Sequence, residues 1–385
     1  MNVNRVRHLE NALNHFERSQ SLAETSLVSI DSHLRSYFRA HKGKVLPRDR
    51  EWISEKFKDI YRWRSLVDHF SLSDKSVANL LRTYFGNQSW RSYSDSKTLP
   101  EHIRVSMPES LYSRLSDHYG KAKAIDIGRI WNEASSTFLR VNSLIEDRER
   151  LLKALTSRGV CVEKTAVSEL ALRVTHAEDL SNSPELEDQA CGFQDESCQI
   201  IGLQVDVKPG EKVLDYCAGS GGKSLVFGPK LKGKGHLFLH DVNDRYLIQA
   251  RHKLKGAGLK NFTCLSPDSI QLKKLKGKVD WILVDPPSTG SGHYRRYPDR
   301  KWLYSDNLLN EKILNQRDIF QNALRYLKRG GKIVYATSSI LPEENAEQIK
   351  YFCDKHKLFL SSEPVYSLPQ SRGMDGFFCA VLEHQ

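Results

Sequence analysis

The sequence predicts an α/β protein whose C-terminal half forms a doubly wound, mainly parallel sheet. From residue 212 onward, short apolar runs of strand length alternate with longer helical stretches. This alternation is typical of a parallel sheet covered by helices. Residues 1–97 contain few glycines, and their apolar residues recur at helical spacing. An all-α domain is therefore expected ahead of the sheet.

The chain has 385 residues, which is enough for two or three domains. A weak boundary falls between Thr98 and Pro108, where two prolines bracket a short stretch. A small α+β segment is predicted after it, with helices at 111–118 and 145–155 and strands at 138–141 and 171–174. We therefore expect three domains: a helical one at 1–104, the small α+β segment at 105–200 and the sheet domain at 201–385.

The sheet domain is expected to begin with a strand at 213–215 that ends in a glycine-rich turn. Further strands are predicted at 235–240, 262–265, 279–284, 332–336 and 377–382, and helices at 244–255, 311–327 and 343–356. In doubly wound sheets, ligands bind at the carboxyl ends of the strands, beside the point where the strand order reverses. The residues that follow the strands are therefore the candidates for a site.

Positive charge is concentrated in part of the sheet domain. The net charge is +11, and residues 251–300 hold eleven basic against four acidic side chains. Surface lysines often serve only solubility, but an excess of this size beside a candidate site favours a polyanionic partner. On charge, Arg295, Arg296, Lys301 and the lysines of 273–278 are the residues expected to bind phosphates.

Several classes of protein are disfavoured by composition. The seven cysteines form no CxxC pair, so neither a disulfide framework nor a zinc site is indicated. The N-terminus lacks the apolar core of a signal peptide, and no apolar run is long enough to cross a bilayer. We expect a cytoplasmic monomer with neither a metal nor a membrane partner.

The turn from Asp215 to Lys223 allows three nucleotide-binding interpretations. A phosphate-binding loop would need glycine at position 217, which is Cys217, and a dinucleotide fingerprint would need glycine at 224, which is Ser224. The third interpretation is S-adenosylmethionine, with Asp241 at the end of the second strand accepting hydrogen bonds from both ribose hydroxyls. A tight strand–helix turn without a ligand is the plain alternative.

Two more aspartates follow predicted strands. Asp268, after the third strand, is placed to bind the adenine amino group, although a solvated loop aspartate is the competing interpretation. Asp285 ends the fourth strand and begins the sequence Asp-Pro-Pro-Ser. Consecutive prolines make a rigid loop, since the ring fixes φ. Asp285 is therefore expected to point into the cleft.

Ordered motifs in residues 106–385 resemble a known family. They are FQDESCQ (193–199), LDYCAGSGGK (214–223), TGSGHYRRYPDRKW (289–302), VYATSSILPEEN (334–345), DGFF (375–378) and the shorter RVN (140–142). They are similar, in this order, to six elements of the Sun/Fmu (RsmB-like) group of RNA cytosine-5 methyltransferases. These elements are QDExSQ, LDxCAAPGGK, the stretch that follows the DAPCS loop, VYATCSxxPEEN, DGFF and RxN. The helical N-terminus resembles, more loosely, the NusB-like domain of the bacterial members.

The resemblance implies a class I S-adenosylmethionine-dependent methyltransferase fold, with a Rossmann-like sheet, acting on RNA and most directly on ribosomal RNA. It also implies which residues bind S-adenosylmethionine: Cys217, Ala218, Gly219, Ser220, Gly221, Gly222, Lys223, Asp241, Asp268 and Asp285. Lys223 and Asp285 would in addition orient the target base. Without the resemblance, Lys223 would be interpreted as an ordinary surface lysine at the start of a helix.

The sequence departs from the family at two catalytic positions. Ser338 stands where the family has its nucleophilic cysteine, and Ser288 stands where it has the second cysteine. Carbon 5 of cytosine accepts a methyl group only after carbon 6 has been attacked. A thiol, with a pKa of about 8.5, does this well, whereas a serine needs an aligned base. The plain interpretation of both serines is that they are small polar replacements at lost thiol sites.

Three functions therefore remain open. The first is an RNA methyltransferase acting on a group that needs no covalent activation. The second is a catalytically degenerate RNA-binding or ribosome-assembly factor that keeps the cofactor pocket. The third, which we rank last, is a cytosine-5 methyltransferase that uses serine.

Overall fold

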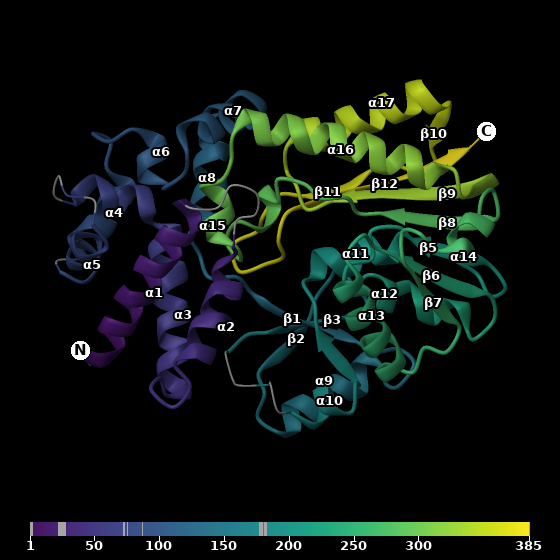
Figure 1. The fold of residues 1–385 in the computed structure, drawn as a ribbon, viewed down its shortest axis with the longest axis horizontal. Helices are drawn as coiled ribbons and strands as arrows, with labels where there is room; N and C mark the ends of the chain where they lie inside the picture. Colours follow the sequence, from purple (N-terminus) through teal and green to yellow (C-terminus); the bar gives the residue numbers. More distant parts are fainter. Residues whose placement is uncertain are drawn as a thin grey trace. The chain divides into compact units, whose positions relative to one another are not determined.

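The computed structural model describes residues 3–384, apart from 22–27, 72, 73, 75, 87, 177–179, 181 and 182. It divides into two compact units (Figure 1). Unit 1 contains residues 1–134 and 293–308, and unit 2 contains residues 135–292 and 309–385. The units therefore do not separate at the predicted boundary after residue 104. Among the described helices, none is long and apolar enough to cross a membrane.

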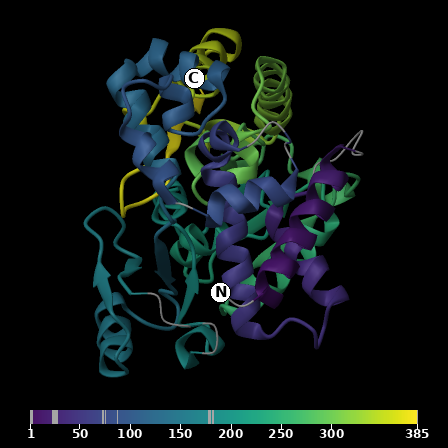
Figure 2. The ribbon, with the colours of Figure 1, turned by 90° about the vertical axis from the view of Figure 1, so that its left-hand side faces the viewer.

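Unit 1 is helical, as predicted for its N-terminal part. Aromatic and aliphatic side chains, among them Phe16, Phe57 and Trp90, form its core, and α1 packs against α3, as Figure 2 shows in purple and blue. Its elements are α1 (Val3–Ser21), α2 (Ile30–Ala40), α3 (Pro47–Arg62), α4 (Arg64–Phe70), α5 (Val77–Phe85), η1 (Gln88–Asp95), α6 (Glu101–Arg104), α7 (Glu109–Tyr119), α8 (Lys121–Trp131) and the inserted α15 (Pro298–Lys301). The looser likeness to NusB stays a prediction.

A small antiparallel sheet opens unit 2. Its strands lie in the order β2 (Val162–Lys164), β3 (Ala171–Val174), β1 (Thr137–Val141) and β4 (Cys191–Phe193). Leu151 and Leu155 of α9 (Arg148–Ser157) pack into its core, and the short α10 (Pro184–Glu187) precedes β4. The predicted strands β1 and β3 are confirmed. The strands β2 and β4, of three residues each, are too short to show an alternating pattern in the sequence.

The large sheet confirms the predicted doubly wound architecture. The order is β10-β12-β9-β8-β5-β6-β7, with β11 paired to β12. Strands β5 to β9 are parallel, and β12 is antiparallel to β9. The bounds are β5 (Lys212–Asp215), β6 (His236–His240), β7 (Phe262–Leu265), β8 (Val279–Val284), β9 (Leu327–Thr337), β10 (Leu358–Leu360), β11 (Val365–Ser367) and β12 (Phe377–His384). The order reverses between β5 and β8, which is where this fold binds ligands.

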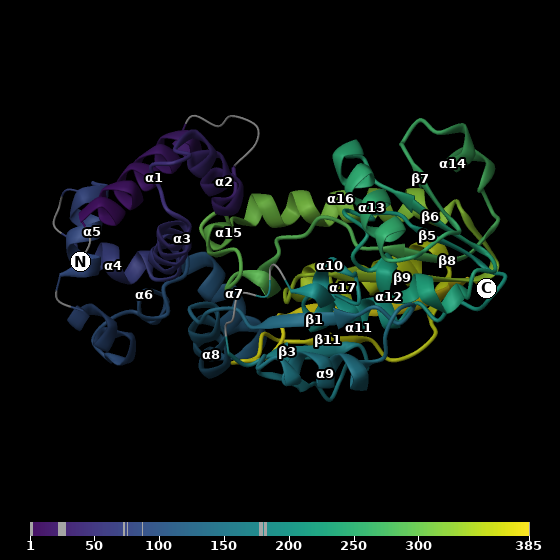
Figure 3. The ribbon, with the colours of Figure 1, turned by 90° about the horizontal axis from the view of Figure 1, so that it is seen from below.

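Helices cover both faces of this sheet. One core contains side chains of α11, α12 and α13, and the other contains side chains of α14, α16 and α17. Figures 1 and 3 show α13 beside the edge strand β7. The helices are α11 (Glu196–Leu203), α12 (Ser224–Phe227), η2 (Gly228–Leu231), α13 (Asp244–Gly256), α14 (Ile270–Lys274), η3 (Ser291–His293), α16 (Asp306–Leu324), η4 (Pro342–Glu344) and α17 (Ala346–His356).

Candidate active site

The glycine-rich turn leaves β5 at Asp215, which is buried. Its carboxylate accepts a hydrogen bond from the Ser224 hydroxyl at 2.7 Å, closing the turn from Asp215 back to α12. Burial raises the pKa of Asp215 to about 7, although the bond from Ser224 opposes the shift. Gly219 and Gly221 both have positive φ, and a Cβ on Gly221 would lie 2.6 Å from Cδ1 of Leu254. These glycines are therefore required by the path of the turn.

Asp241 joins this turn to the end of β6. One of its carboxylate oxygens accepts a hydrogen bond from the Gly219 amide at 2.8 Å, and the other accepts one from the Asn243 amide at 2.8 Å. Beside it, the Ala218 amide donates to the carbonyl of His240 at 2.9 Å. The structure thus brings together the glycine turn and the acid that the sequence predicted for the ribose.

Lys223 and Asp285 form an ion pair in which both side chains are largely buried. Lys223 lies at the start of α12, and Asp285 directly follows β8. Burial alone would lower the pKa of Lys223, but the Asp285 carboxylate outweighs it and raises that pKa above its usual value. Lys223 is therefore held as an ammonium group against a carboxylate, not as a proton donor at neutral pH.

Asp268 lies in the turn after β7 and is exposed. In the described part of the chain, no hydrogen bond or ion pair ties its side chain to the residues above. The structure therefore places Asp268 at the expected strand end. Among the described residues, no contact links Asp268 to the Gly219–Asp241 hydrogen bond or to the Lys223–Asp285 ion pair.

Ser338 and Ser288 follow β9 and β8, and both are half-buried. The Ser338 carbonyl accepts a hydrogen bond from the Gly292 amide at 2.8 Å. The Ser288 hydroxyl accepts one from the Gly290 amide at 3.3 Å. Within the described residues, neither hydroxyl is bonded to a histidine, a lysine or a carboxylate. Among the residues that the structure describes, no base is therefore aligned with either serine.

A buried network that sequence reasoning missed holds these two loops together. Glu344 accepts hydrogen bonds from the Thr289 amide at 2.8 Å, from the Thr289 hydroxyl and from Gln316 at 2.9 Å. The Ser339 and Ser291 hydroxyls lie 3.0 Å apart. Burial raises the pKa of Glu344, against the hydrogen bonds that it accepts. Glu344 lies in the PEEN sequence of residues 342–345, which is therefore the signal from which this network could have been found.

Arg140 of the small sheet contacts the backbone of the glycine turn. Its guanidinium donates to Gln194 at 2.9 Å and to the Gly222 carbonyl at 3.4 Å. Arg140 is buried, which lowers its pKa to about 10. Asp195 accepts hydrogen bonds from Ser197 and, at 3.3 Å, from the amide of Asp375. The RVN, QDESCQ and DGFF motifs therefore lie together in the fold.

Two of the cations expected to bind phosphates are buried, which corrects the sequence-based expectation. The Nζ atom of Lys301 donates hydrogen bonds to the Arg62 carbonyl at 2.9 Å and to Asn132 at 3.1 Å. Arg295 is fully buried, and its backbone carbonyl accepts hydrogen bonds from the Arg62 guanidinium. These contacts fasten the inserted residues 293–308 within unit 1. Arg296 is half-buried, and the lysines at 273, 274, 276 and 278 are exposed.

The sheet order, the glycine turn after β5 and the acids after β6, β7 and β8 define a class I S-adenosylmethionine-dependent methyltransferase fold. A family model described as 16S rRNA methyltransferase RsmB/F matches residues 203–383. A second model, the ferredoxin-like domain of RsmF/B-like methyltransferases, matches residues 107–181. The chain belongs to the RsmB/F family of methyltransferases, as the motifs had indicated.

Known proteins resemble the chain over much of its length. It is 32% identical over 265 residues to ribosomal RNA small subunit methyltransferase B of Serratia proteamaculans, an alignment that covers 65% of this chain and 60% of that protein. The chain thus spans less than two thirds of that relative. The crystal structure of PH0851 matches with a TM-score of 0.78 at 21% identity, covering 99% of this chain and 98% of the other.

A second solved structure, NSun6 from Pyrococcus horikoshii with SFG, matches with a TM-score of 0.65 at 18% identity. It covers 72% of this chain and 98% of that one. At these identities both structures show the shared fold. Within the described residues, no group of three or more histidine, cysteine, aspartate or glutamate side chains is arranged to hold a metal ion.

Proposed function

We propose that this protein transfers the methyl group of S-adenosylmethionine to RNA, with small-subunit ribosomal RNA as the substrate. Membership of the RsmB/F family supports the class of substrate. One observation carries the proposal: the Gly219–Asp241 contact and the Lys223–Asp285 pair both lie at the carboxyl ends of β5, β6 and β8, where the strand order reverses.

The residues at this point fit the cofactor. Each carboxylate oxygen of Asp241 accepts one amide hydrogen bond. A carboxylate oxygen has room for a second donor, so Asp241 retains acceptors for the two ribose hydroxyls. Residues 217–223 would hold the amino-acid end of the cofactor, and the exposed Asp268 would receive the adenine amino group. When bound, S-adenosylmethionine supplies an electrophilic methyl group on sulfur.

The Lys223–Asp285 pair would position the acceptor base. Asp285 is paired with Lys223, and two prolines, which restrict the backbone, directly follow it in the chain. Its carboxylate accepts hydrogen bonds, so it suits an amino group of a base. The raised pKa of Lys223 keeps this residue charged. Lys223 thus fixes Asp285 and supplies positive charge, without releasing a proton.

The acceptor we propose is an exocyclic amine of a base beside Asp285, whose nitrogen would form the new bond to methyl with its own lone pair as the methyl–sulfur bond breaks. The surplus proton on that nitrogen would pass to the Asp285 carboxylate. Methyl transfer to carbon 5 of cytosine needs a prior covalent bond between an enzyme nucleophile and carbon 6. A side chain that forms this bond needs a lowered pKa or an adjacent base. Ser338 and Ser288 lack such a base among the described residues. This chemistry therefore favours the first of the three functions left open by the sequence.

Transfer of radiolabelled methyl groups to total RNA, followed by mass spectrometry of the nucleosides, tests the proposal. We expect a labelled N-methylated nucleoside from the wild-type protein and none from Asp285→Asn. Labelled 5-methylcytidine would contradict the proposed acceptor. RNA binding without any transfer would instead favour the assembly factor.

A further inference from the structure

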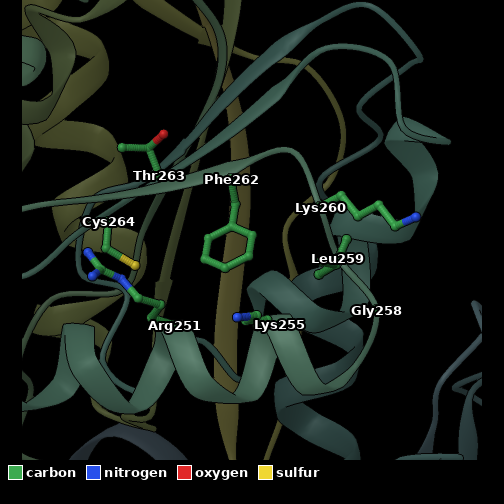
Figure 4. A pocket seen from close by; sticks show the side chains of 8 residues that line it. All are labelled: Arg251, Lys255, Gly258, Leu259, Lys260, Phe262, Thr263 and Cys264. Atoms are coloured by element: carbon green, nitrogen blue, oxygen red, sulfur yellow. The ribbon is translucent and has the colours of Figure 1, made fainter.

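A groove of about 640 Å³ lies between α13 and the edge strand β7 of unit 2. Figure 4 shows the residues that line it: Arg251 and Lys255 from α13, Gly258, Leu259 and Lys260 from the connection, and Phe262, Thr263 and Cys264 from β7. Ligand pockets of ordinary size range from about 300 to 1,000 Å³. The groove is therefore large enough for a nucleotide, and it belongs to neither the glycine turn nor the Lys223–Asp285 pair.

The lining combines positive charge with one aromatic ring. Three of the eight lining residues are cationic and exposed, and none is acidic. The Phe262 ring is half-buried and lies on the side of β7 that faces α13, with the Lys255 side chain close by. Arg251 points toward Cys264 (Figure 4). Basic grooves with an aromatic platform are the common means of holding single-stranded nucleic acid, because cations contact phosphates while a base stacks on the ring.

We propose that this groove binds a single-stranded segment of the RNA substrate, with a base stacked on Phe262 and phosphates paired with Arg251, Lys255 and Lys260. The proposal rests on the proposed function, because it names the surface on which that substrate is held. It does not depend on which atom of the RNA receives the methyl group.

The direction of the groove supports this assignment. In a doubly wound sheet the helix runs antiparallel to the strand beside it, so Lys255 near the end of α13 lies beside Phe262, and Arg251, one turn earlier, lies beside Cys264 (Figure 4). The cations therefore follow β7 toward its carboxyl end. Asp268, the residue proposed to bind adenine, follows that end. RNA lying in the groove would thus lead toward the cofactor edge of the sheet.

Fluorescence anisotropy with a labelled, unstructured RNA of about 12 nucleotides, titrated at several salt concentrations, tests the groove. We expect the triple variant Arg251→Ala, Lys255→Ala, Lys260→Ala to bind about tenfold or more weakly and to lose about two units of salt slope, since each phosphate contact on a single strand contributes about 0.7. The matched control removes one arginine and two lysines that are also exposed in unit 2: Arg329→Ala, Lys234→Ala, Lys350→Ala.

Phe262 provides a second test that does not depend on charge. Phe262 also packs against the sheet core, so Phe262→Leu, which keeps apolar volume, is the informative variant. We expect it to weaken RNA binding about fivefold or more without changing the salt slope, because stacking is lost while the phosphate contacts remain. We expect Phe262→Trp to bind at least as tightly as the wild type.

The outcomes separate this inference from the proposed function. If the wild type binds RNA and the groove triple variant behaves like the control triple variant, the groove assignment is overturned while RNA methylation stands. If the wild type binds no RNA under any salt condition, both fail together. A groove variant that loses RNA affinity but keeps its calorimetric affinity for S-adenosylmethionine supports the assignment and excludes general unfolding.

Discussion

The Asp241 carboxylate accepts a hydrogen bond from the Gly219 amide at 2.8 Å, and the two residues are 22 positions apart in the chain. This bond joins the glycine turn directly to the end of the neighbouring strand. An intramolecular bond that fixes the turn reduces the conformational entropy that the turn loses on binding a ligand, which favours affinity.

Asp241→Ala should weaken the binding of S-adenosylmethionine by about 1.5–3 kcal/mol, the scale of hydrogen bonds to a charged group. Isothermal calorimetry measures the effect. Asp244→Ala is the matched control, because Asp244 is an exposed carboxylate three residues away, in the first turn of α13. Equal affinities of Asp241→Ala and the control would show that Asp241 does not bind the ribose.

Lys223→Met should destabilise the fold by about 3 kcal/mol, because it leaves the largely buried Asp285 carboxylate without its partner. The double variant Lys223→Met, Asp285→Asn should recover much of this loss, since no unpaired charge remains. Urea unfolding of the wild type and of the two variants checks the prediction. A double variant that is less stable than Lys223→Met alone would contradict it.

Asp215 should make stability depend on pH. Its folded pKa of about 7 lies above the value of about 3.9 for an unfolded chain, so the folded state binds the proton more tightly. The stabilisation of the fold by protonated Asp215 is therefore fully present below about pH 4, and it is lost as the pH rises to about 7. The stability of the wild type relative to Asp215→Asn should fall between pH 5 and pH 7.5, on the order of 1 kcal/mol per pH unit. A constant difference in unfolding free energy across this range would contradict it.

The protein should form no covalent adduct with RNA that contains 5-azacytidine. Ser338 and Ser288 have no aligned base among the described residues, and a serine hydroxyl is a poor nucleophile without one. Denaturing gel electrophoresis of the mixture is the measurement, and Ser338→Cys is expected to restore a trapped band. A wild-type band that disappears in Ser338→Ala would show that serine attacks the base.

Lys301→Met should lower stability while leaving the salt dependence of RNA binding unchanged. The Nζ atom of Lys301 is buried and donates hydrogen bonds to the Arg62 carbonyl and to Asn132, and burial lowers the pKa of Lys301 well below its usual value. Losing these bonds should cost about 1–3 kcal/mol. Thermal unfolding and anisotropy at several salt concentrations give the two readouts. A reduced salt slope would place Lys301 on the RNA after all.

The sequence by itself determined the fold class and the positions of the acids. Strand and helix periods are local, so the strands at 213–215 and 279–284 were recognisable from their neighbours alone, and Asp215 and Asp285 follow from where those strands end. Motif order then indicated the family. The replacements at Ser338 and Ser288 were also visible directly, because both lie within intact motifs.

Only the tertiary structure decided which charges are buried and what they contact. Lys301 meets Arg62 across 239 positions of the chain, and Lys223 meets Asp285 across 62. A local count of positive charge cannot distinguish a surface cation from one enclosed by remote segments. The Glu344 network and the groove beside Phe262 likewise exist only once distant elements pack together. Burial and pairing depend on long-range contacts, and for that reason the sequence placed Arg295 and Lys301 on the surface and the fold did not.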